Sequence, residues 1–253
     1  MSDDRAALAL QLAWGADEAL LEAAQDRRIA AAEAPATRAR AAQQAAPLPA
    51  GPTEAARIAQ GCESLPALEQ ALAGFTGCAL RETATRLVFG DGPMSARLML
   101  VGEAPGAEED RAGRPFIGPA GQLLERMLGS IGLARGEVRM TNVLPWRPPG
   151  DRSPTVSEIM LCMPFLLRHI ALVRPSCVLL LGAVAAKALP GEAPGIGRLR
   201  GNWRELAVPG EAPIPCLASW HPAYLQRVPA AKADAWADLL KIREFLELGG
   251  GPG

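Results

Sequence analysis

The sequence predicts an α/β fold, a three-layer α/β/α sandwich in which a central, mainly parallel sheet lies between helices. Short apolar runs alternate along the chain with longer segments of helical periodicity, an order typical of parallel sheets. The run at 98–101 is continuously apolar, as expected for a strand buried on both faces. A helical N-terminal extension is expected to precede this fold.

The individual elements follow from the same patterns. The first strand covers 98–101 and stops at Gly102, and a helix with an apolar stripe begins near Gly121. Further strands are predicted at 138–144, 176–181, 203–208 and 214–218, and further helices at 54–72, 157–173, 183–189 and 232–248. Pro164 is expected to be tolerated in its helix or to kink it. The segments 103–120, 194–201 and 219–227 are predicted to be loops.

The N-terminal part differs in composition from the rest. Residues 3–33 are rich in alanine, leucine and charge, which predicts one or two helices, whereas 34–53 combine prolines and alanines without apolar periodicity. We therefore expect two parts: a helical extension with a Pro/Ala linker at 1–53, and one domain at 54–253. What the extension binds is not indicated.

Composition limits the classes of function. The 253 residues carry a formal net charge of −1, so any nucleic-acid affinity must come from a local basic patch. There is no uninterrupted apolar run long enough for a membrane span, and the acidic N-terminus argues against a signal peptide. The five cysteines are odd in number and scattered, unlike a secreted disulfide framework. These features predict a monomeric cytoplasmic protein.

The stretch at 97–128 is where chemistry is expected. It reads as a buried strand, then a loop rich in glycine, proline and acid, then a helix. In α/β proteins, ligands bind at the carboxyl ends of the strands. Glu103 and Glu109 in this loop are therefore candidate functional carboxylates, although acidic runs more commonly form solvated faces.

Five motifs in one order make the reading more specific. They are Gly102-Glu103-Ala104-Pro105-Gly106, Gly113-Arg114-Pro115-Phe116-Ile117-Gly118, Thr141-Asn142-Val143, Arg147-Pro148-Pro149-Gly150-Asp151-Arg152 and His221-Pro222-Ala223. Together they resemble the family 4 (thermophile-type) uracil-DNA glycosylases over roughly residues 75–240. The first 50 or so residues have no counterpart in that family.

The resemblance implies a role for each motif residue. A glycosylase flips its target base out of the duplex before it breaks the N-glycosidic bond. Phe116 would stack on the flipped uracil, and the Asn142 amide would donate to O4 and accept from N3–H, a pattern that cytosine reverses. His221 would stabilise negative charge developing near O2. Glu103 is the first candidate for orienting water and Glu109 a second.

Further residues follow from the same resemblance. Substrate-binding positions are Ala104, Pro105, Gly106 and Asp110, with Asp110 also a second-line carboxylate. Phosphate-gripping positions are Arg114, Arg147, Arg152, Arg200 and Arg227. Leu225 would be the wedge that fills the stack vacated by the flipped base. Each of these residues has an ordinary structural reading when taken alone, and His169 is expected to be structural.

The sequence departs from the family at the iron–sulfur cluster. Family 4 enzymes usually hold a 4Fe–4S cluster on four cysteines, and the corresponding positions here are Phe75, Cys78, Trp146 and Cys162. Only two thiolates remain where such a cluster generally needs four. We therefore expect no cofactor and no metal, with Cys62 as a substitute ligand being the alternative.

The expected function is monofunctional excision of uracil from DNA, without cleavage of the backbone. Two alternatives remain open. A relative with shifted base preference, for hypoxanthine or xanthine, is disfavoured by Asn142, whose amide matches uracil. A non-catalytic DNA-binding relative is conceivable because cluster ligands are missing, yet Glu103, Asn142 and His221 are all present.

Overall fold

The computed structural model describes residues 54–188 and 195–249. Within them the sheet has the order β2-β1-β3-β5-β4, formed by β1 (Leu98–Gly102), β2 (Val138–Asn142), β3 (Cys177–Leu181), β4 (Trp203–Leu206) and β5 (Ile214–Ser219). All pairings are parallel except that of the edge strand β4 with β5. The predicted mainly parallel sheet is confirmed, and every predicted strand is present.

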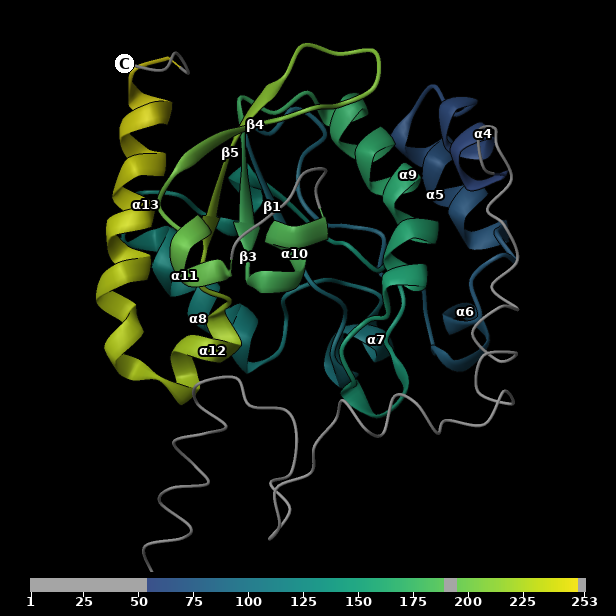
Figure 1. The fold of residues 1–253 in the computed structure, drawn as a ribbon, viewed down its shortest axis with the longest axis horizontal. Coiled ribbons are helices and arrows are strands. Elements are labelled where there is room, and N and C mark those ends of the chain that lie inside the picture. The colour runs from purple at the N-terminus through teal and green to yellow at the C-terminus, as the bar shows by residue number, and fades with distance from the viewer. Residues whose placement is uncertain (1–53, 189–194, 250–253) are drawn as a thin grey trace, which may run out of the picture. The chain divides into compact units, whose positions relative to one another are not determined.

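Helices cover both faces of the sheet (Figure 1). One face carries α4 (Glu54–Gln60), α5 (Leu65–Gly74), α9 (Val156–Val173) and α10 (Ala183–Ala188), and the other carries α8 (Pro119–Gly129) and α13 (Lys232–Glu247). Successive β1 side chains point to opposite faces, as strand geometry requires. Met99 and Val101 enter the core on the α9 side, and Leu98 and Leu100 enter the core on the α13 side. The three-layer sandwich is therefore confirmed.

Short helices interrupt the segments that were predicted to be loops. They are α7 (Ala107–Ala112), α11 (Ile196–Leu199) and α12 (Pro222–Arg227), with α6 (Leu80–Thr83) further upstream. Acidic residues fill the first turn of α7, and Gly113 ends it in the left-handed conformation, both of which stabilise a helix. Pro222 opens α12, where proline costs no hydrogen bond. None of these helices is long enough to show apolar periodicity.

The predicted helix at 54–72 is two helices in the structure. The chain turns after Gln60, and α5 restarts with Ser64 as its N-cap, whose Oγ accepts from the Ala67 amide at 3.3 Å. The break lets both helices pack on α9. In contrast, the helix around Pro164 is continuous. The extension predicted at 1–53 lies outside the described residues, so its boundary and helices stay predictions.

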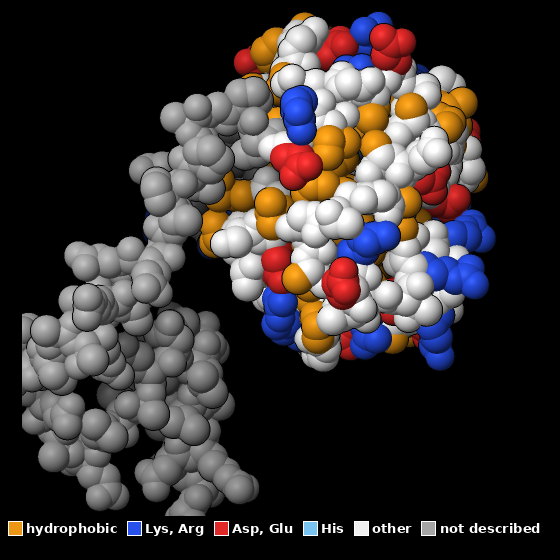
Figure 2. Space-filling model, turned by 90° about the vertical axis from the view of Figure 1, so that its right-hand side faces the viewer, with side chains coloured by type: hydrophobic (Ala, Val, Ile, Leu, Met, Phe, Trp, Pro, Cys, Tyr) orange, Lys and Arg blue, Asp and Glu red, His pale blue; other side chains and the backbone are white. Residues whose placement is uncertain are grey.

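In the described part of the chain, α9 is the one helix long and apolar enough to cross a membrane by length and composition alone. Its buried residues Cys162, Phe165, Leu166 and Ile170 belong to the hydrophobic core against the sheet. We therefore assign it as a core helix. Figure 2 shows the side of the molecule that carries α4, α5 and α9, where acidic and basic side chains are interspersed rather than gathered by sign.

Candidate active site

A hollow of about 340 Å³ lies where the carboxyl ends of the parallel strands meet. Glu103 directly follows β1, Asn142 is the last residue of β2, and His221 lies two residues beyond β5. The chain leaves β1 for β2 on one side and later returns to β3 on the other, and ligands bind at such a switch point. The lining residues are Glu103, Ala104, Pro105, Gly106, Glu109, Phe116, Ala120, Asn142, Pro148, Asp151, Arg152, His221, Ala223, Tyr224 and Arg227.

Phe116 and Asn142 lie close together over Gly102. A Cβ placed on Gly102 would come within 2.4 Å of Asn142 Oδ1 and 2.6 Å of Phe116 Cζ. The strand must therefore end in glycine for both side chains to reach the hollow. The rings of Phe116 and His221 have their centroids 6.2 Å apart and are inclined by 31°. The structure thus brings together the three residues that were predicted to surround the base.

The backbone of Phe116 is held in an unfavourable conformation. Its φ is 54°, in the left-handed region, which costs a non-glycine residue free energy. A Cβ at Gly121 would clash with the Phe116 carbonyl. Helix α8 can therefore pack this closely against the loop only because residue 121 is glycine. Arg135 donates to the carbonyl oxygens of Phe116 at 2.7 Å and of Pro115 at 2.6 Å. Arg135 lies outside the five motifs, so no sequence signal identified it.

His221 is oriented by the helix that it begins. Its Nδ1 accepts a hydrogen bond from the Ala223 amide at 3.2 Å, making His221 the N-cap of α12. Burial, with the nearby Arg227 as a smaller cause, lowers the pKa of His221 to about 4. The ring is therefore neutral at pH 7, and because Nδ1 accepts, this network assigns the proton to Nε2. His221 can then act as a hydrogen-bond donor through Nε2.

The two candidate carboxylates occupy different environments. Burial raises the pKa of Glu103, and a hydrogen bond with Ser153 opposes that shift. Glu109 is instead tied to the loop before α8, because its Oε1 accepts from the amides of Ile117 at 3.1 Å and Gly118 at 2.9 Å. Glu109 therefore holds the Phe116 loop in place. Glu103 is the carboxylate with fewer structural ties.

The predicted place of Asp110 is corrected by the structure. Its side chain is 4% exposed and does not line the hollow. Its Oδ1 accepts from the Thr85 amide at 2.8 Å and from the Arg86 amide at 3.3 Å. Asp110 therefore ties α7 to the segment before β1. Its neighbours Ala104, Pro105 and Gly106 do line the hollow, as expected.

The predicted phosphate contacts divide into two groups. Arg152 and Arg227 are exposed and line the hollow, and Arg147 lies in the same loop as Arg152, paired with Asp151 at 2.7 Å. Arg114 is exposed but does not line the hollow, and it pairs with Asp91 at 3.0 Å. Only Arg147, Arg152 and Arg227 therefore lie near the opening of the hollow.

Arg200 and Leu225 do not fit their predicted DNA contacts. The side chain of Arg200 is 18% exposed and pairs with the buried Asp238 at 2.7 Å, which anchors the segment before β4 to α13. Leu225 is 1% exposed and packs against Ala231 and Ala235. A buried leucine can serve as a wedge only by leaving this core, so the role of Leu225 stays a prediction.

The positions at which the resemblance places cluster ligands do not form a four-thiolate site. Phe75 and Trp146 are both buried, and the Phe75 ring lies 5.1 Å from that of Phe165. The thiols of Cys78 and Cys162 interact with each other: their hydrogen bond lowers the pKa of Cys78 and, together with burial, raises that of Cys162. Two of the four ligand positions therefore carry buried aromatic rings in place of thiols.

The alternative ligand does not complete the set. The Cys62 thiol donates to the Ile58 carbonyl at 3.3 Å. Among the described residues, no three His, Cys, Asp or Glu side chains converge as potential metal ligands. Of the four ligand positions, only Cys78 and Cys162 carry thiols, fewer than the four thiolates that a 4Fe–4S cluster generally needs.

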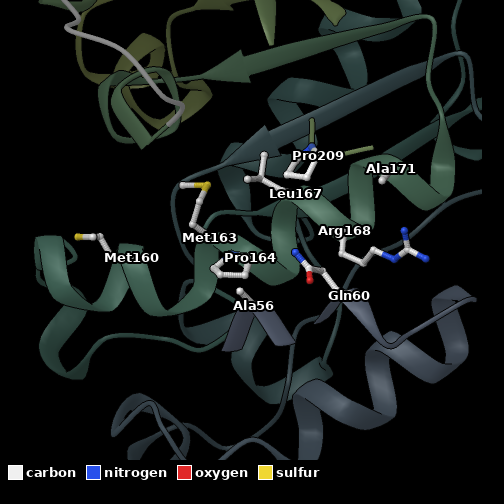
Figure 3. A pocket seen from close by; sticks show the side chains of 9 residues that line it. All are labelled: Ala56, Gln60, Met160, Met163, Pro164, Leu167, Arg168, Ala171 and Pro209. Carbon is white, nitrogen blue, oxygen red and sulfur yellow. The ribbon is translucent and has the colours of Figure 1, made fainter. Parts of the chain in front are cut away.

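A second hollow, of about 360 Å³, lies between α4 and α9 and has different walls (Figure 3). It is lined by Ala56, Gln60, Met160, Met163, Pro164, Leu167, Arg168, Ala171 and Pro209. The one charged side chain among these, Arg168, donates to the Cys62 carbonyl at 2.8 Å. These walls contain no carboxylate and no imidazole, so they offer no acid or base. Size alone does not identify the active site.

Comparison with known proteins agrees with this geometry. The family model of the uracil DNA glycosylase superfamily matches residues 89–240. The chain is similar to the type-4 uracil-DNA glycosylases of Archaeoglobus fulgidus (38% identity, covering 72% of this chain and 94% of the relative), Pyrobaculum aerophilum (39%, 64% and 84%) and Thermotoga maritima (40%, 60% and 78%). The chain therefore belongs to the uracil-DNA glycosylase superfamily, and within it to the type-4 family.

Proposed function

We propose that this protein is a monofunctional uracil-DNA glycosylase, which flips uracil out of DNA and hydrolyses its N-glycosidic bond. The observation that carries the proposal is the convergence of Phe116, Asn142 and His221 on one hollow, in a chain of the type-4 family. An aromatic ring, an amide and a neutral imidazole around one hollow suit a flat base with polar edges.

Recognition of the base rests on two residues. The Phe116 ring stacks on uracil, and its constrained loop leaves little conformational entropy to be lost on binding. The Asn142 amide donates to O4 and accepts from N3–H. With cytosine, the N–H and the oxygen of this amide would both be left unpaired. Buried polar groups left without partners discriminate strongly against the wrong base. Hypoxanthine and xanthine present the same pair of a carbonyl and an N–H to Asn142, so their rejection would rest on the larger size of a purine in the hollow.

Cleavage uses two further groups. The bond between C1′ and N1 breaks, and its electron pair leaves with uracil, where charge develops at O2. The Nε2–H of His221 donates to that oxygen. Glu103 stabilises the cationic sugar and orients a water, whose oxygen bonds to C1′. The water gives up one proton to the surrounding solvent, and the uracil anion takes up one proton and leaves as neutral uracil. No backbone bond is broken in this step, and the described lining of the hollow contains no lysine amine that could form a Schiff base with the sugar.

DNA is gripped at the mouth of the hollow. Arg227 supplies positive charge there. Arg152 and Arg147 add to it once phosphate competes with their carboxylate partners, Glu158 and Asp151. We propose that the enzyme works as a cytoplasmic monomer without an iron–sulfur cluster, since Phe75 and Trp146 occupy two ligand positions. Light scattering of the purified protein checks the oligomeric state.

Release of free base from oligonucleotides that carry a single U, I or T tests the activity. Release from the U substrate alone is expected, leaving an intact backbone with an abasic site. Release from the I substrate at a higher rate would favour the shifted base preference. Tight binding of all three oligonucleotides without base release would favour a non-catalytic DNA-binding protein.

A further inference from the structure

Two aromatic rings on either side of His221 stack against each other, and one of them lines the hollow. Trp220 precedes His221, and Tyr224 lies in the first turn of α12. Their centroids are 4.6 Å apart, with the planes inclined by 23°. Tyr224 lines the hollow together with Arg227 and is partly exposed. It is the only tyrosine in the sequence.

The pair is fixed from behind. The Trp220 indole N–H donates to Asp234 Oδ2 on α13 at 3.3 Å. Both rings pack against the small apolar cluster of Leu225, Ala231 and Ala235. Tyr224 therefore stands in position before any ligand arrives, so little conformational entropy is lost when a ligand stacks on it.

The surroundings of Tyr224 suit a nucleobase. Trp220 covers one side of its ring, and the ring also borders the hollow, where an exposed arginine stands one helical turn away at Arg227. Aromatic rings beside basic side chains form the usual platform for single-stranded nucleic acid. Leu225, which was expected to support the opened DNA, is buried. The next side chain able to fill that need on α12 is Tyr224.

We propose that Tyr224, supported by Trp220, is a stacking site for the nucleobase next to the flipped uracil. The inference rests on the proposed function, because it needs a DNA strand that is opened at the hollow. It adds a contact with the flanking strand to the recognition of uracil itself. The ring accepts any base, so the contact contributes affinity without sequence preference.

An oligonucleotide with 2-aminopurine beside a tetrahydrofuran abasic analogue tests the proposal, because it cannot be hydrolysed and its fluorescence reports stacking. Wild-type protein should change the 2-aminopurine emission on binding, and Tyr224→Phe should keep that change. Tyr224→Leu keeps apolar bulk without a ring. It should lose the change and raise the Kd about 5- to 150-fold, as expected for one lost base stack.

Two controls make the result specific. Arg227→Gln should weaken binding and reduce the salt dependence by about one phosphate contact, yet retain the emission change at saturation. Trp220→Leu removes the support and should weaken binding less than Tyr224→Leu does. Thermal unfolding of every variant shows that each is folded, and Tyr224→Phe provides a folded reference that retains the ring.

The outcomes separate this inference from the proposed function. If wild type excises uracil and Tyr224→Leu binds and alters emission as wild type does, the stacking site is wrong and the glycosylase assignment stands. If wild type binds the probe with the stacking signal but releases no uracil, the stacking site stands and the assignment fails. Equal binding by folded Tyr224→Leu and Tyr224→Phe would also overturn the stacking site.

Discussion

The guanidinium of Arg135 donates to the carbonyl oxygen of Phe116 at 2.7 Å while its other nitrogen atoms pair with Asp91 at 2.7–2.9 Å. One side chain, placed just before β2, thus holds the loop that presents the Phe116 ring. The fork geometry of arginine permits these simultaneous contacts, and a lysine ammonium cannot reproduce them.

We therefore expect Arg135→Lys and Arg135→Ala to impair uracil binding by releasing the Phe116 loop. Single-turnover excision should slow, and inhibition by free uracil should weaken, while affinity for abasic-analogue DNA changes little. Added guanidinium should partly restore Arg135→Ala but not Arg135→Lys. Arg174→Ala, which removes an exposed pair with Glu211, is the matched control and should excise normally. If free uracil inhibits both Arg135 variants as strongly as it inhibits wild type, Arg135 does not hold the Phe116 loop for uracil binding.

Acid is expected to destabilise the protein through His169. This histidine is buried, accepts from Arg139 Nε at 3.0 Å and stacks on Phe89, and burial lowers its pKa to about 3. The unfolded chain has a histidine pKa near 6.5. Between these values the unfolded state binds more protons, so the free energy of unfolding falls as the pH is lowered through that window.

Each pKa unit corresponds to about 1.4 kcal/mol, so His169 alone should remove about 3 kcal/mol of stability between pH 7 and pH 4. His221, with its pKa lowered to about 4, acts in the same direction. Denaturant unfolding at the two pH values measures the loss. His169→Gln keeps an acceptor for Arg139 but does not titrate. This variant should be less stable than wild type at pH 7 and should lose less unfolding free energy between pH 7 and pH 4. An identical loss in both proteins would exclude His169 as the cause.

The convergence of the site could be predicted from the sequence because it depends on chain topology. Asn142 and His221 each follow a strand, and the carboxyl ends of parallel strands share one edge of the sheet. The features that could not be predicted have a different origin. The burial of Leu225 and the pairing of Arg200 depend on α13, whose rotation against the sheet is set by tertiary packing. Arg135 belongs to no motif, because its partners are two backbone carbonyls and two carboxylates that lie far from it in sequence, Asp91 and Glu125.

Purified protein should be colourless and contain no stoichiometric iron. Phe75 and Trp146 place buried rings at two ligand positions, and the thiols at the other two, Cys78 and Cys162, form a hydrogen bond with each other. Iron analysis and the visible absorbance spectrum, after expression with added iron and anaerobic purification, check this. The double variant Phe75→Cys/Trp146→Cys restores four thiols. It should bind iron if the two missing thiols are the reason that the wild-type protein does not. Iron at about four atoms per wild-type chain would show that another ligand set operates.

The roles of Asn142 and His221 can be separated by single-turnover excision, which isolates chemistry from product release. His221→Ala removes the donor to O2 and should slow uracil release about 10²-fold, as for other oxyanion donors. DNA affinity should be nearly unchanged, because the interaction strengthens only as charge develops. Glu103→Ala should likewise slow the chemical step without weakening binding.

Asn142→Asp changes specificity rather than charge stabilisation. A carboxylate cannot donate to O4, so uracil loses one contact, while the amino group of cytosine gains an acceptor. The rate ratio for uracil over cytosine should therefore fall, whereas His221→Ala should slow any accepted base and leave that ratio high. Phe116→Ala should weaken the binding of both uracil and cytosine by about 1–3 kcal/mol, because the stacking contact is lost. Among the described side chains that line this hollow, Asn142 offers the one amide and His221 the one imidazole. If His221→Ala and Asn142→Asp both retain wild-type single-turnover rates on uracil, these residues do not form the active site.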